Sequence, residues 1–73
     1  MIEEGYYVSL KEYFLNDCSE RYTHFGSNEI FRVIKLEFEI ATYYIYNYNG
    51  LLKMKLYKYS DEVFNFIKNN CKN

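Results

Sequence analysis

The chain has 73 residues, enough for a single small domain over residues 1–73 but close to the lower limit for a self-supporting core. A hydrophobic fraction of 49% and a charged fraction of 26% exclude a disordered chain, and no apolar run is long enough to span a membrane. The formal net charge of −1 indicates neither a nucleic-acid nor a membrane ligand, although residues 1–40 carry −4 and residues 41–73 carry +3.

The composition indicates where the gene comes from. Asn, Lys, Ile, Tyr and Phe make up 37 of the 73 residues, Pro and Trp are absent, and those five amino acids have AT-rich codons. We therefore expect a low-GC bacterium, or a phage or plasmid living in one, as the source. The opening Met-Ile-Glu-Glu lacks the basic start and apolar stretch of a signal peptide, so we expect a cytoplasmic protein of the bacterial host cell with reduced cysteines.

Aromatic side chains are unusually frequent, with ten Tyr and six Phe making 22% of the chain. Each ring buries a large area and so helps a small core, but so small a body cannot bury all of them. Several rings must face solvent or a partner. We therefore expect either a homodimer or a complex with a larger protein.

The first predicted element is a helix over residues 10–22. Ser9 and Glu12 have the spacing of a capping box, in which each side chain satisfies a backbone N–H at the start of a helix. Gly26 offers the left-handed conformation that commonly ends a helix. Between these signals, apolar side chains recur at near-helical spacing, at Leu10, Phe14, Cys18 and Tyr22.

Residues 29–48 fit two interpretations. As a helix, they present an apolar stripe of Phe31, Ile34, Phe38, Ala41, Ile45 and Tyr48. As strands, they alternate apolar with polar positions. The apolar positions are Ile34, Leu36, Phe38 and Ile40, and the polar positions between them are Lys35, Glu37 and Glu39. We favour strands, because twelve of the nineteen residues from 30 to 48 are β-branched or aromatic. The apolar positions change from even to odd after Ile40, which predicts a β-bulge or a tight bend there.

A hairpin centred on Asn49 and Gly50 follows. Both residues tolerate the positive φ of a two-residue type I′ turn, and this turn fixes the register of the two strands. On the mostly aliphatic face, the predicted pairs are Asn47 with Leu52, Ile45 with Met54, Tyr43 with Leu56, and Ala41 with Lys58. On the tyrosine- and lysine-rich face, they are Tyr48 with Leu51, Tyr46 with Lys53, Tyr44 with Lys55, and Thr42 with Tyr57.

The chain is predicted to end in a short helix over residues 60–73. Ser60 can cap it, and Asp61 and Glu62 favour the positive end of the helix dipole. The apolar stripe of this helix consists of Phe64, Ile67 and Cys71. The predicted fold is therefore α+β: a helix, a three-stranded antiparallel β-meander and a C-terminal helix, with both helices on one sheet face.

No catalytic, metal or cofactor site is predicted. The spacing of Cys18, His24 and Cys71 fits no common zinc pattern, and the same groups would need an orienting partner for nucleophilic catalysis. Two carboxylate pairs have sufficient structural explanations, on a strand or at a helix start: Glu37 with Glu39, and Asp61 with Glu62. Only three Gly occur, none in a phosphate-binding cluster.

The tyrosine- and lysine-rich hairpin face is the strongest functional feature. We predict that it binds a partner through Tyr44, Tyr46, Tyr48, Lys53, Lys55 and Tyr57. Tyr is favoured at protein interfaces, whereas Tyr with Lys can also bind single-stranded nucleic acid. Self-association, or a plain solvent-facing surface, is the third interpretation of this face. The expected function is a small non-enzymatic protein-binding protein, typical of accessory proteins of phages and mobile elements. Inhibitors of host defence, anti-CRISPR proteins among them, are one such class. The alternative is a single-strand nucleic-acid binder or small regulator.

Overall fold

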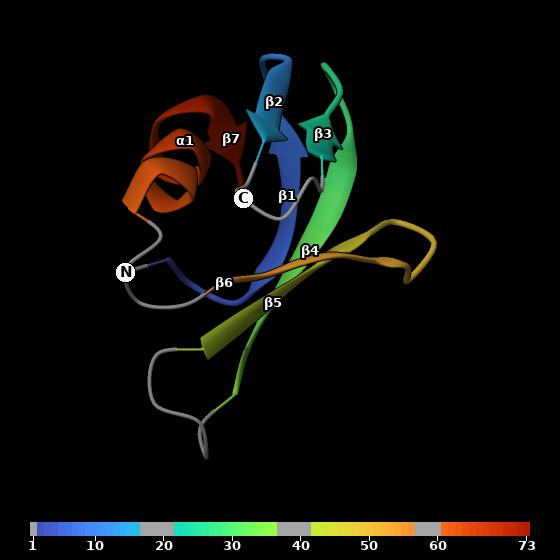
Figure 1. Ribbon diagram of the computed structural model, residues 1–73, viewed down its shortest axis with the longest axis vertical. Helices are drawn as coiled ribbons and strands as arrows, with labels where there is room; N and C mark the ends of the chain where they lie inside the picture. Colours follow the sequence, from blue (N-terminus) through green and yellow to red (C-terminus); the bar gives the residue numbers. More distant parts are fainter. Residues whose placement is uncertain (1, 17–21, 37–41, 57–60) are drawn as a thin grey trace.

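The computed structural model describes residues 2–16, 22–36, 42–56 and 61–73 (Figure 1). In chain order these contain β1 (Gly5–Ser9), β2 (Tyr13–Asn16), β3 (Tyr22–Phe25), β4 (Ile30–Leu36), β5 (Thr42–Asn47), β6 (Leu52–Leu56), α1 (Asp61–Asn70) and β7 (Cys71–Lys72). Five strands form one antiparallel sheet in the order β6-β5-β4-β1-β7, and β2 pairs with β3 in a two-stranded sheet. The predicted helix–meander–helix arrangement is therefore wrong, because the described chain is mostly sheet.

The predicted meander exists as one part of the five-stranded sheet, formed by β4, β5 and β6. β4 and β5 pair in one continuous register over residues 31–36 and 42–47, so the helical alternative for this stretch does not hold there. β1 then pairs with the other side of β4, and β7 pairs with β1. The bulge or bend predicted after Ile40 lies outside the described residues.

The segment predicted as a helix over residues 10–22 instead contributes strands. β2 and β3 form a hairpin inserted between β1 and β4, with Tyr13 opposite Phe25 and Phe14 opposite His24. Its residues are largely aromatic, aliphatic or β-branched, and such side chains gain from cross-strand contacts in a pleated sheet. These contacts outweigh the approximate helical spacing of a few apolar positions.

Backbone hydrogen bonds close the base of the β2–β3 hairpin onto the main sheet. Ser9 N donates to Glu29 O at 2.8 Å, and Asn28 N donates to Ser9 O at 2.7 Å. The predicted capping box is wrong, because Ser9 is a fully buried strand residue whose hydroxyl donates to the Lys11 carbonyl at 2.6 Å. The left-handed residue in the following turn is Asn28, with φ 64°, and not Gly26.

The predicted C-terminal helix is confirmed as α1 only as far as Asn70, because Cys71, predicted on its apolar stripe, begins β7. The first turn of α1 carries Asp61 and Glu62, as expected for the positive end of a helix dipole, and the expected cap at Ser60 lies outside the described residues. Phe64 is half-buried and meets the Tyr43 ring edge-on at 5.3 Å. The buried stripe is rotated from the predicted one and consists of Val63, Phe66 and Ile67.

The core lies between one face of the five-stranded sheet and a second layer made by α1 and the β2–β3 hairpin (Figure 1). Phe25 of β3 is fully buried, with its ring 5.0 Å from Phe31 of β4 and 5.5 Å from Phe66 of α1. Tyr13 of β2 stacks on Phe66 at 4.2 Å and donates to the Glu62 carboxylate at 2.6 Å. A hairpin therefore takes the place of the predicted first helix, and it covers the same sheet face as α1.

Candidate interaction surface

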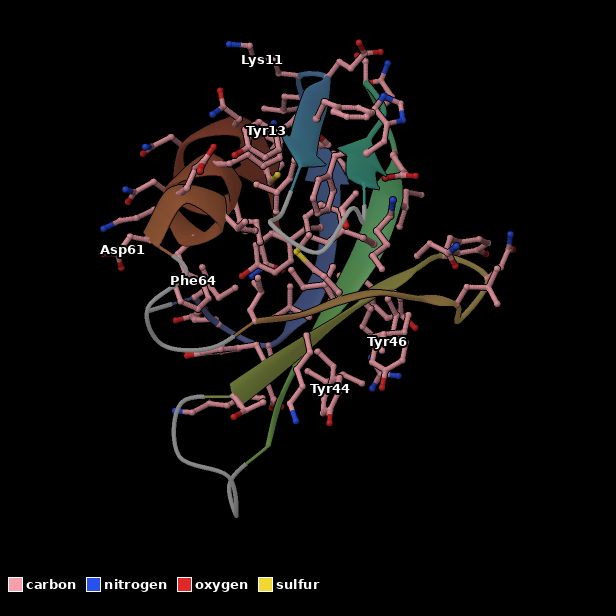
Figure 2. All side chains as sticks on the ribbon, in the orientation of Figure 1. Lys11, Tyr13, Tyr44, Tyr46, Asp61 and Phe64 are labelled. Carbon is pink, nitrogen blue, oxygen red and sulfur yellow. The ribbon has the colours of Figure 1, made fainter. Side chains whose placement is uncertain are left out.

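The sheet face that points away from α1 and the β2–β3 hairpin is called the outer face. Figure 2 shows Tyr44 and Tyr46 on this side, with Tyr13 and Phe64 on the opposite side beside α1. Strand alternation and the observed pairings assign Thr42, which is buried, and ten further described positions to the outer face. The ten further positions are Tyr6, Val8, Ile30, Arg32, Ile34, Tyr44, Tyr46, Leu52, Lys55 and Lys72.

Side chains of the outer face form rows across neighbouring strands. In one row, which crosses four strands, Arg32 of β4 lies opposite both Tyr6 of β1 and Tyr46 of β5, and Tyr46 lies opposite Leu52 of β6. Directly opposed side chains of antiparallel strands have their Cβ atoms about 4.5–5.5 Å apart, so each row is a continuous contact surface. The next row consists of Ile34, Tyr44 and Lys55.

Two cations of the outer face lie over tyrosine rings of the same face. Arg32 Cζ lies 5.6 Å from the centre of the Tyr6 ring, and Lys55 Nζ lies 5.4 Å from the centre of the Tyr44 ring. The Tyr44 and Tyr46 rings are 6.2 Å apart. Such cation–π contacts contribute about 0.5–1 kcal/mol at exposed sites, and here they hold the positive charges along the sheet.

The charge of the outer face differs from that of the whole chain. Its described positions include three cations, at Arg32, Lys55 and Lys72, and no carboxylate, whereas the chain has a formal net charge of −1. Among the described residues, Arg32 takes part in no ion pair. The outer face is therefore a local positive surface on a nearly neutral protein.

The turn between β5 and β6 has three residues instead of the predicted two. Gly50 N donates to Asn47 O at 3.0 Å, and Asn47 N donates to Leu51 O at 2.9 Å. Gly50 has φ 85°, the left-handed conformation required at the last position of such a turn. Asn47 Oδ1 also accepts from the N–H groups of Asn49 and Leu51, at 2.9 and 3.0 Å. The predicted pairing of Tyr48 with Leu51 is therefore wrong, and Tyr48 is a turn residue with 72% exposure.

A β-bulge in β6 then restores the predicted register. Near the turn, Tyr46 lies opposite Leu52, so the predicted partners Lys53 for Tyr46 and Leu52 for Asn47 are wrong. The register shifts between Ile45 and Tyr46, and Lys53 is the extra residue. Beyond the bulge, three predicted pairs are confirmed: Ile45 with Met54, Tyr44 with Lys55, and Tyr43 with Leu56.

The bulge turns Lys53 toward the β2–β3 hairpin and away from the outer face. Lys53 Nζ donates to the His24 carbonyl at 2.6 Å, lies 3.0 Å from the Glu29 carboxylate, and sits 5.0 Å from the centre of the Phe25 ring. Thr23 Oγ1 also donates to the Lys53 carbonyl at 3.4 Å. Lys53 therefore joins the two layers of the protein at the edge of the sheet.

The six residues predicted to bind a partner are thus only partly brought together. Tyr44, Tyr46 and Lys55 share the outer face, and Tyr48 stands beside it in the turn. Lys53 lies on the other side of the sheet, and Tyr57 lies outside the described residues. A binding role for these residues stays a prediction.

The sequence interpretation missed the contribution of β1 and β4 to this surface. It assigned Ile34 to the apolar face of its strand, but Phe31 and Val33 are buried at 0% and 1% exposure, so Ile34 faces outward with Arg32. In the sequence, the odd positions Phe31 and Val33 form an apolar alternation as regular as that of the even positions from Ile34 onward, which the sequence interpretation assigned to the core. The missed strand β1 contains Tyr6 within Gly-Tyr-Tyr-Val-Ser, where aromatic and β-branched residues are a strand signal.

Other candidate groups do not converge on a second site. His24 Nε2 lies 3.4 Å from the Glu12 carboxylate on the exposed part of the β2–β3 hairpin. Burial raises the pKa of the Cys71 thiol to about 11, so its unreactive neutral form prevails at pH 7. Within the described ranges, no group of three or more His, Cys, Asp and Glu side chains is arranged to hold a metal ion. Three further candidates, Cys18, Glu37 and Glu39, lie outside those ranges.

None of the helical segments in the described part of the chain has the length and apolar character needed to cross a membrane. Comparison with protein-family models, with curated proteins and with solved structures finds no significant match to this chain.

Proposed function

We propose that this protein is a non-enzymatic binding protein whose outer face covers an acidic surface of a larger protein. The proposal rests on one observation: a sheet face that α1 and the β2–β3 hairpin leave free and that, among the described residues assigned to it, combines tyrosine rings, aliphatic side chains and three cations with no carboxylate. Rings and aliphatic groups supply the apolar contact area, and Tyr and Arg are the residues most often found as interface anchors. The charge of the face selects a partner surface of opposite sign.

A protein partner explains the outer face better than single-stranded nucleic acid does. Val8, Ile30 and Leu52 can neither stack on bases nor pair with phosphates, although they suit a protein interface. The rings of Tyr6 and Tyr44 already have a cation of their own chain over one side, which reduces the ring surface available for stacking. Binding of a single strand therefore remains the alternative that the experiments below must exclude.

The proposal of a non-enzymatic role rests on the structural tasks that the acidic and basic groups perform. Glu62 accepts from the Tyr13 hydroxyl at 2.6 Å and ties α1 to β2. Glu29 pairs with Lys53 at 3.0 Å between the two layers. Glu4 accepts from the Lys35 N–H at 2.7 Å where β1 begins. These contacts stabilise the fold and require no further chemistry.

A protein of this kind can act by occlusion, which is the mode of action we propose. The high share of amino acids with AT-rich codons supports an accessory protein of a phage or mobile element, which we propose acts in the cytoplasm of the bacterial host. Inhibitors of host defence, including the anti-CRISPR type, are then the first class to test. A homodimer also remains proposed, but two outer faces cannot meet without opposing like charges, so such a dimer would leave the outer face free.

Substitution of outer-face tyrosines tests the proposal directly. Wild-type protein, Tyr44→Ala and Tyr46→Ala are immobilised and exposed to extracts of low-GC bacteria, with Phe14→Ala as a matched control. Phe14 is an exposed ring on β2, on the opposite side of the sheet from Tyr46. Retained proteins are identified and purified, and their affinities are measured by calorimetry. Circular dichroism on the same samples verifies that each variant is folded.

The proposal predicts a partner that binds wild type and Phe14→Ala alike and loses about 2 kcal/mol or more of affinity with Tyr46→Ala. Equal binding by all four proteins would show that the active surface lies elsewhere. A twenty-nucleotide oligo-dT probe provides the second arm. Tight binding of this probe that weakens steeply with salt, in the absence of any protein partner, would favour the nucleic-acid alternative.

A further inference from the structure

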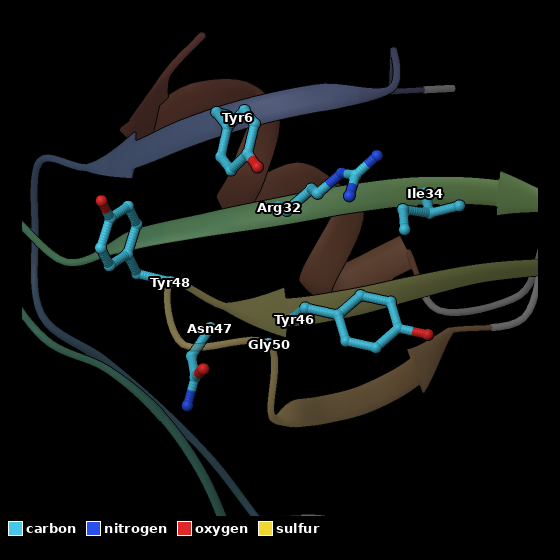
Figure 3. A pocket seen from close by; sticks show the side chains of 7 residues that line it. All are labelled: Tyr6, Arg32, Ile34, Tyr46, Asn47, Tyr48 and Gly50. Carbon is cyan, nitrogen blue, oxygen red and sulfur yellow. The ribbon is translucent and has the colours of Figure 1, made fainter.

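The outer face contains a hollow that Arg32 lines (Figure 3). Its volume is ≈ 260 Å³. Tyrosine rings from β1, β5 and the β5–β6 turn line it together with Arg32, whose guanidinium extends away from Tyr48, and α1 lies behind the sheet. The complete lining consists of Tyr6, Arg32, Ile34, Tyr46, Asn47, Tyr48 and Gly50. We call this hollow the Arg32 pocket.

The size of the Arg32 pocket limits what it can hold. Sites for small molecules and cofactors occupy about 300–1,000 Å³, and the Arg32 pocket is smaller and open to solvent on a flat sheet. It is the size expected for one side chain of a bound protein. Pockets of this kind at the centre of an interface receive the anchor residues that contribute most to affinity.

The chemistry of the Arg32 pocket specifies an anion. Arg32 is charged at all physiological pH values, and among the described residues it pairs with no carboxylate. Apart from the Tyr6 ring, whose centre lies 5.6 Å from Cζ, the guanidinium contacts no partner group among the described residues. A carboxylate is planar and accepts two parallel hydrogen bonds from such a fork. The surrounding rings exclude water when the face is covered, which strengthens this pairing.

The Arg32 pocket is also preorganised. Tyr48 stands at its rim because the turn is fixed by the Gly50 to Asn47 backbone hydrogen bond and by two bonds to Asn47 Oδ1. Tyr46 and Arg32 are directly opposed on neighbouring strands. Little ordering is therefore required on binding, and this reduces the entropic cost of association.

We propose that the Arg32 pocket, which Tyr6, Tyr46 and Tyr48 also line, receives the carboxylate of a single Asp or Glu side chain of the partner protein, held by Arg32. This inference rests on the proposed function, because it names the group by which the outer face recognises its partner. A phosphorylated side chain offers similar charge in a bulkier, non-planar form, and the experiment separates the two.

The probe is N-acetyl-glutamate N-methylamide, titrated into ¹⁵N-labelled protein and followed by NMR. The glutamine analogue is the matched neutral control, and phenyl phosphate represents the phosphorylated side chain. The expected result is a saturable shift of the Arg32 Nε–H signal and of the Tyr46 and Tyr48 amide signals. The glutamine analogue and phenyl phosphate should each bind on the order of tenfold more weakly, because the pocket selects a planar anion.

Arg32→Lys keeps the charge but removes the fork, and it should weaken binding of the glutamate probe on the order of tenfold. The inference is overturned if no shifts occur at 50 mM probe, if they lie outside the Arg32 pocket, if the glutamine analogue binds equally, or if Arg32→Lys has no effect. Tighter binding of phenyl phosphate would also overturn it, in favour of a phosphorylated partner.

Capture of the larger partner separates this inference from the proposed function. Tyr44 lies on the outer face but does not line the Arg32 pocket. If Tyr44→Ala abolishes capture while Arg32→Lys does not, the outer face is the binding surface and the carboxylate inference fails. If neither variant changes capture, the proposed function fails as well.

Discussion

Replacement of Lys53 tests the arrangement of the two layers. Lys53→Ala removes a charge-assisted hydrogen bond to the His24 carbonyl and the ion pair with Glu29. The side chain of Lys53 is only 12% exposed and that of Glu29 is 31% exposed. A hydrogen bond to a charged group contributes about 1.5–3 kcal/mol. The contact of the cation with the Phe25 ring adds about 0.5–1 kcal/mol. Immobilising the lysine side chain costs up to about 2 kcal/mol of conformational entropy in the wild type, and the alanine variant avoids this cost. We therefore expect a loss of about 2 kcal/mol in the free energy of unfolding.

Lys55→Ala is the matched control, because Lys55 lies two residues away on the same strand and faces the outer side. Loss of its contact with the Tyr44 ring costs about 0.5–1 kcal/mol. Urea unfolding followed by circular dichroism measures both variants. In thermal unfolding, Lys53→Ala should lower Tm by about 8–16 °C, since 1 kcal/mol corresponds to about 4–8 °C in a domain of this size.

A second substitution separates charge from packing. Lys53→Met keeps the aliphatic stem over Phe25 but leaves the Glu29 carboxylate without its cation, so it should still destabilise the protein. Adding Glu29→Gln should recover part of that loss, which a double-mutant cycle measures as a coupling energy. If the cycle shows no coupling between Lys53 and Glu29, Lys53 does not join the two layers.

Four further outcomes are expected. Tyr43→Phe should raise the free energy of unfolding in urea by up to about 1 kcal/mol, because the buried Tyr43 hydroxyl has no hydrogen-bond partner among the described residues; a loss of stability would contradict this. Ser9→Ala should cost about 1 kcal/mol through loss of the bond to the Lys11 carbonyl, and an unchanged urea midpoint would argue against it. Burial and the bond to the Glu62 carboxylate raise the pKa of Tyr13 from 10.0 to about 12, so its contribution to stability is complete below pH 10 and is lost as the pH rises to 12; Tyr13→Phe should reduce that alkaline fall, and identical pH profiles would refute it. Light scattering at micromolar concentration should give twice the chain mass of 9.0 kDa if the proposed homodimer forms, and the single-chain mass would exclude it.

Features with strong local signals could be predicted from the sequence. The C-terminal helix begins at Asp61, as the two consecutive acids and the apolar spacing indicate. The hairpin forms around Asn49 and Gly50, and Gly50 does adopt a positive φ. In both segments the pattern, the turn residues and the tertiary environment favour the same structure, which is the condition under which local reasoning succeeds.

The N-terminal half could not be predicted in this way, because two local signals compete there. The spacing of Ser9 and Glu12 matches a capping box, but the surrounding aromatic residues favour strands. Burial decides between them, since Phe25 can fill the core only if β3 folds back over β4 and α1. That decision depends on contacts with residues more than 40 positions away, such as Phe66, which no local pattern contains.

The outer face shows how a partly wrong turn can leave a site assignment partly right. A three-residue turn alone would shift every pair along β6 by one, which would exchange the two faces of the strand. The bulge at Lys53 cancels that shift, so Ile45 still meets Met54 in the core and Tyr44 still meets Lys55 outside. The bulge affects one residue, Lys53, whose side chain no longer lies on the outer face. Within the described part of this stretch, Tyr44, Tyr46 and Lys55 therefore lie on the outer face, while Lys53 contacts the hairpin that covers the opposite face of the sheet.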